Sequence, residues 1–329
     1  MSWQNRLVCW YLQRRFLPAT REPIDVAQVR AHTSKRIWSP GPPAGFRLRE
    51  QYAAADTPLR GEWLLREAED AARTILYLHG GGYYFCSPKS HRTITFGLAP
   101  RAQADVFSLD YRLAPEHPFP AALDDACAAY RQLIAAGRRA GSIVIAGDSA
   151  GGGLALATLV ALRDAGDPLP AGAVLYSPWT DLAGSGASMR ENDGRDPMFC
   201  ADVFARVAPL YLGTQSMTHP LASPLYADLH GLPPLFMLAG STEVLLDDTR
   251  ALAERAREAG VQVECEIGEG LPHIWPIYAP FLPEARRALD DSARFVREVT
   301  PTAGTRGPRG PRGPHGANGA QASETSIAS

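Results

Sequence analysis

A serine flanked by glycines is the residue of this chain best suited to act as a nucleophile. Ser149 stands in a G-x-S-x-G pattern over residues 147–151. The apolar residues 142–146 before it are typical of a short buried strand, and the Ala- and Leu-rich residues 149–164 are typical of a helix. Between a strand and a helix, this pattern forms a sharp turn that exposes the serine hydroxyl. Asp148, beside the serine, either tunes it electrostatically or holds the turn through nearby backbone.

A second glycine-rich segment, HGGG at residues 79–82, follows the expected strand 74–78. Glycines let backbone amides turn outward, and such amides stabilise the negative charge that develops on a carbonyl under attack. The helix after Ser149 adds its positive dipole end. We therefore expect an oxyanion hole formed by the amides of Gly80, Gly81 and Ala150. Either motif alone could be a chance match or a flexible turn, but their order and strand contexts favour chemistry.

The serine needs a general base, which in folds with this turn lies later in the chain than the nucleophile and the acid. His273 fits best, because it lies in a turn-rich loop, residues 270–275, after the expected strand 261–267. A loop position suits a side chain that must reach the serine. The other histidines lack a comparable setting and are expected to be structural, exposed or in the tail.

The acid that would orient His273 is less sharply defined, because residues 240–248 carry three carboxylates. Glu243 is favoured, since it lies in the turn just beyond the expected strand 234–239. Asp247 and Asp248 come about one helical turn later, where acids commonly favour the helix dipole. Asp247 stays as the alternative. The acid would hold the correct tautomer of the histidine without taking its proton.

Strand-like and helix-like segments alternate around these residues. This alternation predicts an α/β fold with a mainly parallel sheet covered by helices on both faces. The expected strands lie near 74–78, 104–109, 142–146, 172–176, 234–239 and 261–267, and the expected helices near 120–137, 149–164, 245–259 and 283–299.

Over residues 40 to 300 the chain resembles the hormone-sensitive lipase group of α/β-hydrolases, also called bacterial family IV esterases. The resemblance is carried by the two glycine motifs and by three further segments at 110–122, 177–181 and 231–234. It implies the α/β-hydrolase fold, with Ser149 as nucleophile, His273 as base and the amides of Gly80, Gly81 and Ala150 as the oxyanion hole. The acid position of the family, usually Asp, falls on Glu243.

The resemblance also implies a helical cap over the site. Its first part would be residues 1–45, where Trp3, Leu7, Trp10, Tyr11 and Arg14 recur at helical spacing, and its second part residues 183–225. The α/β-hydrolase core would then comprise 46–182 and 226–300. We expect Tyr83, Met198 and Phe199 to contact substrate, although the aromatic residues of the cap could instead only pack helix on helix. Residues 301–329 are rich in Gly and Pro and are expected to form a disordered tail.

Composition excludes several other classes of protein. The 33 basic and 35 acidic side chains give a net charge of −2, which offers no basic field for nucleic acid. Five scattered cysteines suggest neither a zinc site nor a disulfide framework. No stretch approaches about 18 apolar residues, and no signal peptide is visible, so a cytoplasmic enzyme without metal or cofactor is expected.

The predicted activity is acyl transfer through a covalent acyl-enzyme. The family resemblance implies that the substrate is a small-molecule carboxylic ester with a short to medium acyl chain. An amidase or deacetylase would use the same three residues, and a non-catalytic ligand receptor on this fold is the alternative from another class. The sequence does not specify the natural substrate, the stereopreference, or whether the protein forms a homodimer.

Overall fold

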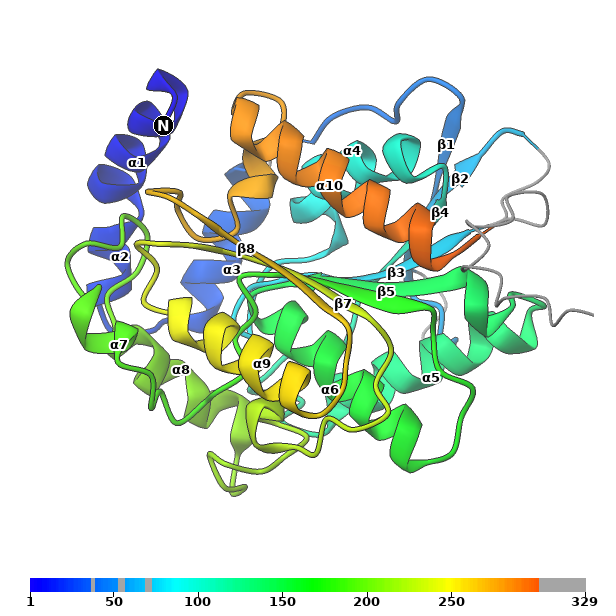
Figure 1. Ribbon diagram of the computed structural model, residues 1–329. Helices are drawn as coiled ribbons and strands as arrows, with labels where there is room; N and C mark the ends of the chain where they lie inside the picture. Colours follow the sequence, from blue (N-terminus) through cyan, green and yellow to red (C-terminus); the bar gives the residue numbers. More distant parts are fainter. Residues whose placement is uncertain (37–38, 53–56, 69–72, 302–329) are drawn as a thin grey trace, which may run out of the picture.

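The computed structural model describes residues 1–36, 39–52, 57–68 and 73–301 (Figure 1). The predicted tail therefore lies outside the described residues from position 302 onward. In the described part, the sheet has eight strands in the order β1-β2-β4-β3-β5-β6-β7-β8. Strands β3 to β8 run parallel to one another, and β1 and β2 are added antiparallel at one edge. The strands are β1 (Phe46–Gln51), β2 (Gly61–Arg66), β3 (Thr74–Leu78), β4 (Asp105–Leu109), β5 (Ile143–Asp148), β6 (Gly172–Tyr176), β7 (Leu235–Gly240) and β8 (Val263–Gly268).

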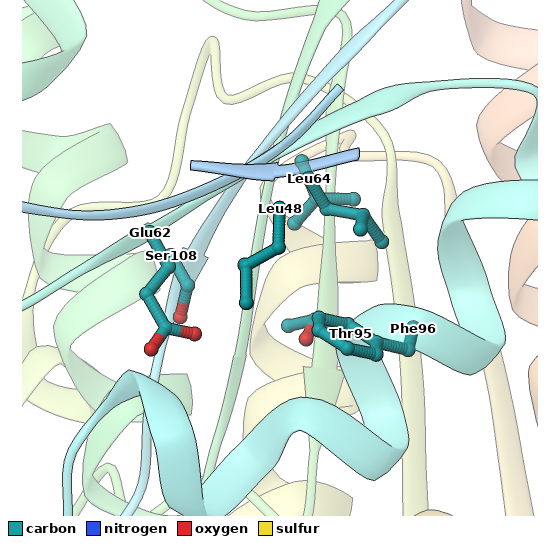
Figure 2. Close-up of a pocket in the computed structure, with 7 residues that line it drawn as sticks. Leu48, Glu62, Leu64, Thr95, Phe96 and Ser108 are labelled. Atoms are coloured by element: carbon teal, nitrogen blue, oxygen red, sulfur yellow. The ribbon is translucent and has the colours of Figure 1, made fainter. Parts of the chain in front are cut away.

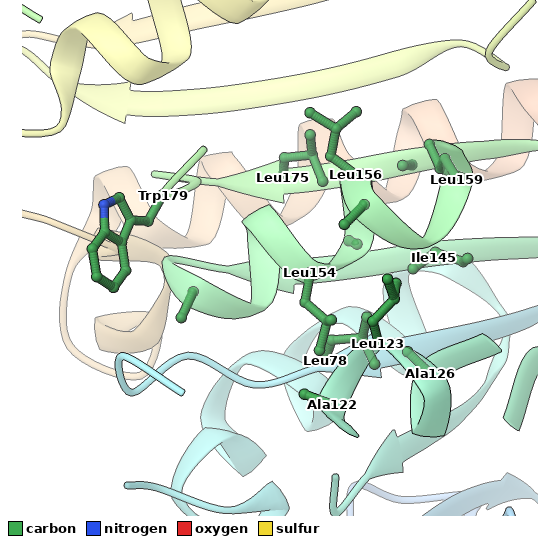
Figure 3. Close-up of a cluster of buried hydrophobic side chains, with 14 of the residues drawn as sticks. Leu78, Ala122, Leu123, Ala126, Ile145, Leu154, Leu156, Leu159, Leu175 and Trp179 are labelled. Atoms are coloured by element: carbon green, nitrogen blue, oxygen red, sulfur yellow. The ribbon is translucent and has the colours of Figure 1, made fainter. Parts of the chain in front are cut away.

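Helices cover both faces of the sheet (Figure 1). Helices α4 (Arg92–Ala102) and α10 (Pro283–Val299) pack on each other over one face. Helices α5 (Ala121–Ala135), α6 (Ala150–Asp164) and α9 (Leu246–Glu258) cover the other. Each face has its own apolar cluster, and Figure 3 shows leucines of α6 packed with side chains of the sheet and of α5. The α/β class expected from the sequence is confirmed.

The central strands are mainly apolar and buried along their length because helices cover both of their faces. All five residues of β3, β4 and β6 are buried. All six predicted strands and all four predicted helices are present, within one or two residues at their ends. The sequence analysis placed no element on β1, β2 or α4. Strand β1 alternates half-buried and exposed positions at the sheet edge, and α4 contains an internal proline, Pro100.

The two predicted cap segments fold as helices that pack against each other (Figure 1). The first contains α1 (Trp3–Arg15), α2 (Leu17–Arg21) and α3 (Val26–Arg36), and the second α7 (Ser188–Glu191) and α8 (Asp202–Leu212). The guanidinium of Arg206 on α8 donates to the carbonyl oxygens of Thr20 and Glu22. The aromatic rings of Phe16 and Phe199 meet edge to face at 5.6 Å. These contacts join residues almost two hundred positions apart in the chain.

The large apolar residues that the sequence analysis noted along α1 face outward. Trp3, Leu7, Trp10 and Tyr11 are all exposed, whereas the inner face of the helix buries Asn5, Val8 and Leu12. They therefore do not serve to pack one helix on another. None of the helices in the described ranges is both long and apolar enough to cross a lipid bilayer.

Four short 3-10 turns complete the described chain: η1 (Pro88–His91), η2 (Ala140–Ser142), η3 (Pro224–Tyr226) and η4 (Trp275–Tyr278). A small hollow that is too narrow to hold a water molecule lies between α4 and the antiparallel edge of the sheet (Figure 2). It is lined by Leu48, Glu62, Leu64, Thr95, Phe96, Val106 and Ser108. No residue predicted to do chemistry borders this hollow.

Candidate active site

Ser149 occupies the sharp turn between β5 and α6. Its backbone lies at φ 51° and ψ −123°, a conformation that non-glycine residues rarely adopt. The turn is held by main-chain hydrogen bonds, in which the Ser149 amide donates to Tyr176 at 2.8 Å and its carbonyl accepts from Trp179 at 2.9 Å. The strained geometry predicted from the G-x-S-x-G pattern is therefore present, and β6 and its following loop over-determine it.

The glycines around the serine are required by close backbone contacts. A Cβ atom on Gly147 would lie 2.2 Å from the carbonyl oxygen of Gly151, and one on Gly151 would lie 2.1 Å from that of Leu78. These neighbours are main-chain atoms that cannot turn aside. The start of α6 is thus pressed against the ends of β3 and β5.

The HGGG loop after β3 differs from expectation at one position. The Gly80 amide, a predicted oxyanion donor, donates to Oδ1 of Asp148 at 3.0 Å and is therefore engaged in this structure. Gly81 and Gly82 follow at φ 115° and 57°. In the described part of the chain, their amides donate to no protein acceptor. Ala150 is the first residue of α6, where an amide has no acceptor inside the helix.

Asp148 is the buried residue that fixes the HGGG loop to β5. Besides the Gly80 amide, its carboxylate accepts from the Tyr77 hydroxyl at 2.7 Å and contacts Nε2 of His91 at 3.1 Å. Burial opposes ionisation of Asp148, but His91 and the hydrogen bonds outweigh it, and the pKa of the carboxyl is lowered. The hydrogen bonds of the Asp148 carboxylate thus hold the HGGG loop rather than the turn at Ser149 itself.

His273 and Glu243 form a buried pair after β8 and β7. Nδ1 of His273 lies 2.6 Å from Oε2 of Glu243, and both side chains are at most 1% exposed. Oε1 of Glu243 accepts from the Ser177 hydroxyl at 2.7 Å and from the Gly240 amide. The Ser177 hydroxyl in turn accepts from the Ile274 amide at 3.0 Å, so one serine joins the loops of both residues.

The electrostatics of this pair favour a basic imidazole. Burial by itself would lower the pKa of His273, but the charge and hydrogen bond of Glu243, aided by Asp196 and Asp148, raise it overall. With Nδ1 facing Glu243, the other ring nitrogen is left for proton transfer. That nitrogen, Nε2, is buried and has no hydrogen-bond partner among the described residues. No hydrogen bond joins it to Ser149, and such bonds often form fully only with substrate bound.

The two alternative carboxylates are engaged elsewhere. Oδ2 of Asp247 accepts from the Ser188 amide at 2.8 Å, and the Asp247 amide donates back to the Ser188 hydroxyl at 3.0 Å. Oδ2 of Asp248 accepts the amides of Thr180 and Asp181 at 2.7 and 2.8 Å. Both acids therefore bind loops to the start of α9, and only Glu243 contacts the histidine.

Asp196 is a buried acid beside this pair that the sequence analysis did not single out. Oδ2 accepts the Val244 amide at 3.0 Å, next to Glu243, and Oδ1 accepts the Met198 amide at 2.8 Å. Burial and the charge of Glu243 raise the pKa of Asp196 to about 6, against backbone hydrogen bonds that lower it. An Asp-Pro pair signals only a turn in a sequence, so nothing there points to this contact.

The three predicted substrate contacts lie in different settings. The Phe199 ring packs edge-on against the His273 ring at 5.1 Å and against Phe204 of α8 at 5.3 Å. Tyr83 is only 1% exposed and stacks on Tyr211 with ring centroids 3.7 Å apart. Met198 packs with Val8 and Leu12 of α1. Phe199 thus borders the base directly, while Tyr83 joins the HGGG loop to α8 and Met198 joins the second cap segment to α1.

Comparison with known proteins extends this picture. The family model for the alpha/beta hydrolase fold matches residues 75–277. The chain is 50% identical over 239 residues to an acetyl-hydrolase of Streptomyces hygroscopicus, covering 73% of this chain and 80% of that protein. It is 36% identical to the carboxylesterase/phospholipase LipF of Mycobacterium tuberculosis, covering 80% and 72%.

Solved structures match nearly the whole chain. A crystal of EstE5 soaked with p-nitrophenyl butyrate has a TM-score of 0.85 and 37% identity, covering 92% of this chain and all of that one. An esterase described as a bacterial hormone-sensitive lipase family member has a TM-score of 0.83 and 39% identity, covering 91% and 99%. Since the likeness extends over nearly the whole described chain in both sequence and fold, the protein belongs to the hormone-sensitive lipase family of α/β-hydrolases.

Proposed function

We propose that the protein is a serine carboxylesterase that uses Ser149 as nucleophile, His273 as general base and Glu243 as the orienting acid. The observation that carries this proposal is the buried His273–Glu243 pair at 2.6 Å, whose Nε2 has no partner in the described structure. A carboxylate on Nδ1 sets the tautomer in which Nε2 can accept a proton. Carboxylic ester hydrolysis is also the chemistry of the relatives.

In the acylation step, Nε2 of His273 takes the hydroxyl proton as Oγ of Ser149 attacks the ester carbonyl carbon. The carbonyl oxygen becomes an oxyanion, for which we assign the free amides of Gly81, Gly82 and Ala150 as donors. The imidazolium then gives its proton to the leaving alkoxide, and the alcohol departs. Glu243 stabilises the charged imidazole without taking its proton.

In the deacylation step, His273 removes a proton from water, and the resulting hydroxide attacks the acyl-enzyme carbonyl. The same amides hold the second oxyanion. Protonation of Ser149 by His273 then releases the carboxylic acid and restores the enzyme. No atom beyond these residues and water is needed to balance the reaction.

For substrate, we propose small carboxylic esters with short to medium acyl chains. The Phe199 ring packs against the His273 ring in a T-shaped contact, so an acyl group near the base would meet an apolar wall. Tyr83 and Met198 would support that wall by joining it to α8 and α1. The relatives named acetyl-hydrolase, and the neighbour soaked with p-nitrophenyl butyrate, are consistent with short acyl groups.

The segments 1–45 and 183–225 are proposed to form the cap that excludes water from this site. A cytoplasmic location is a finer proposal that rests on the sequence, whereas the choice between monomer and homodimer is left open by it. Sedimentation velocity of the purified protein would determine the oligomeric state.

The proposal is tested by hydrolysis of p-nitrophenyl esters from acetate to laurate, together with labelling by a fluorophosphonate. We expect kcat/KM to peak at short or medium chains, one phosphonyl adduct to map to Ser149, and Ser149→Ala to lose both reactions. A p-nitroanilide of the preferred acyl group should turn over far more slowly. An enzyme inactive on every ester yet labelled at Ser149 and active on the anilide would be an amidase instead.

A further inference from the structure

The outer face of α1 exposes large apolar side chains to solvent, which a surface helix usually buries. Trp3, Leu7, Trp10 and Tyr11 lie within one helical face and are 66%, 47%, 53% and 53% exposed. A helix on a globular protein normally turns such residues toward the core. Phe281 from the loop before α10 extends this surface, with its ring edge-on to Trp3 at 5.7 Å and 42% exposed. We call these five side chains the aromatic face.

The aromatic face is outward because the opposite face of α1 is firmly bound to the core. The Asn5 amide group donates to the Gly270 carbonyl at 2.8 Å, and Val8 and Leu12 pack on Met198. At the start of the helix, the amide and hydroxyl of Ser2 donate to Glu284 of α10 at 2.8 and 2.9 Å. A simple rotation of α1 could not bury the aromatic residues without breaking these contacts.

The charges of α1 are all positive. The helix carries Arg6, Arg14 and Arg15, all exposed, and no acidic residue. Arg6 and Arg15 flank the aromatic face on the helical wheel, and the Arg14 guanidinium lies 5.8 Å from the Trp10 ring. The whole chain has a net charge of −2, so this positive charge is local. The acid nearest the start of α1 is Glu284 of α10, and its carboxylate is already bound to Ser2.

We propose that the aromatic face of α1 docks on the surface of an anionic phospholipid membrane. Tryptophan and tyrosine favour the headgroup region, and arginines beside them are attracted to anionic lipids while their stems stay in apolar surroundings. A second copy of this chain fits the face less well, because pairing two α1 helices would bring two sets of three arginines together. The inference does not depend on the proposed catalytic residues.

Vesicle pelleting tests the proposal. Purified full-length protein is mixed with sucrose-loaded vesicles of equimolar phosphatidylcholine and phosphatidylglycerol, or of phosphatidylcholine alone. We expect binding to the anionic vesicles in low salt, weaker binding at about 0.5 M NaCl because of screening, and a blue shift of tryptophan fluorescence. Arg6→Gln/Arg14→Gln/Arg15→Gln should weaken binding roughly a hundredfold, since each arginine near an anionic surface contributes about fivefold.

Trp3→Ala/Trp10→Ala should weaken binding at least as strongly and remove the blue shift. The matched controls are Met217→Ala/Tyr226→Ala, two other exposed apolar side chains, and Arg47→Gln/Arg139→Gln/Arg257→Gln, three exposed arginines on other elements. Circular dichroism melting would show that each variant is folded, and Trp10→Ala alone avoids the contact of Trp3 with Phe281.

Three results would overturn the proposal. One is no pelleting of the parent protein with anionic vesicles. Another is pelleting that the α1 variants and the control variants reduce equally, which would indicate non-specific adsorption. The third is a concentration-dependent dimer in sedimentation that Trp3→Ala/Trp10→Ala abolishes without vesicles, which would make the face an interface between copies.

Discussion

The two halves of the active site are built in different ways. The Ser149 half lies at the centre of the sheet, where main-chain atoms of β3, β5 and α6 are so close that only glycine fits at positions 147 and 151. The His273 half lies nearer the sheet edge, after β7 and β8, and is held by hydrogen bonds between side chains and loops. One half is fixed by backbone crowding and the other by a buried polar network.

This difference determines how each half should fail. Crowded backbone tolerates no added atom, but it is insensitive to pH. A polar network tolerates changes of shape, but each missing partner leaves a buried group unsatisfied, and its carboxylates respond to protons. Four substitutions would sharpen or break the comparison.

Replacing Glu243 by Gln should have the largest effect on turnover. The amide keeps the shape but cannot hold the imidazolium or favour the correct tautomer, so kcat should fall about 10³- to 10⁴-fold. Steady-state hydrolysis of p-nitrophenyl butyrate would measure this loss. The matched control is Asp247→Asn, four residues away, which should change kcat by less than about threefold. A comparable loss for both variants would contradict the assignment of the acid.

The residual activity of Glu243→Gln should also change its pH dependence. Glu243 raises the pKa of His273, and the reaction needs the neutral imidazole. Removing the charge should therefore lower that pKa and move the acidic limb of kcat/KM to lower pH. A pH–rate profile of the variant measures the shift. An acidic limb that stays in place would show that another group controls it.

Gly151→Ala should cost about 10² to 10³ in kcat. Its Cβ would lie 2.1 Å from the Leu78 carbonyl oxygen and 2.5 Å from that of His79, so the start of α6 must move and carry Ser149 with it. Gly141→Ala is the control, because a Cβ there meets nothing within 4 Å. Rate measurements and thermal melting of both variants are needed. Full activity in Gly151→Ala would mean that the crowding is not what positions the serine.

Ser177→Ala should reduce kcat about tenfold, because the hydroxyl links Glu243 to the Ile274 amide beside His273. Loss of its hydrogen bonds should also destabilise the fold by about 1 to 3 kcal/mol. Ser142→Ala removes a hydroxyl bound to Arg139 at 2.8 Å, away from the site, and should affect stability alone. Denaturant unfolding combined with steady-state rates separates the two effects.

Asp248→Asn should have the smallest effect on turnover and a measurable one on stability. Burial raises the pKa of Asp248 to about 7, whereas the unfolded chain would titrate near its ordinary value of 3.8. Between pH 4 and pH 7, Asp248 is therefore protonated in the folded state and ionised in the unfolded chain. The free energy of unfolding falls as pH rises from about 4 to 7. An amide oxygen in place of Oδ2 can still accept the Thr180 and Asp181 amides. The variant should therefore be stabler than the parent above pH 7, on the order of a few kcal/mol, and equal near pH 4. Thermal melts across this range would test it, and parallel curves would refute it.

The same difference explains what sequence could predict. Glycines at 147 and 151 mark backbone crowding in the sequence itself, so the turn at Ser149 could be predicted. Mainly apolar runs mark the buried parallel strands β3 to β7, and alternation of apolar and charged residues marks β8. Glu243 could be favoured as the acid because it follows directly after the apolar run of its strand, and in the structure it contacts His273.

The polar network could not be read in this way. Ser177, Asp196 and Asp148 find their partners 66, 48 and 68 positions away along the chain, and no local spacing indicates such contacts. The hydrogen bond between the Gly80 amide and Asp148 is an example of a contact that the sequence did not predict. The HGGG pattern identifies a loop with exposed amides. Which of these amides is already hydrogen-bonded depends on the carboxylate of Asp148, which comes from another strand.

That bond has a consequence for directed evolution. The Asp148 carboxylate contacts three residues: Tyr77, Gly80 and His91. These four residues therefore form one group in which each member depends on the others. A library that randomises any one of these positions alone should consist mostly of inactive members, whatever the new residue offers to a substrate. Phe199 contacts His273 from a separate loop, and among the described residues it has no hydrogen bond to this group. Variation at Phe199 can therefore explore new acyl specificities while the HGGG loop stays intact.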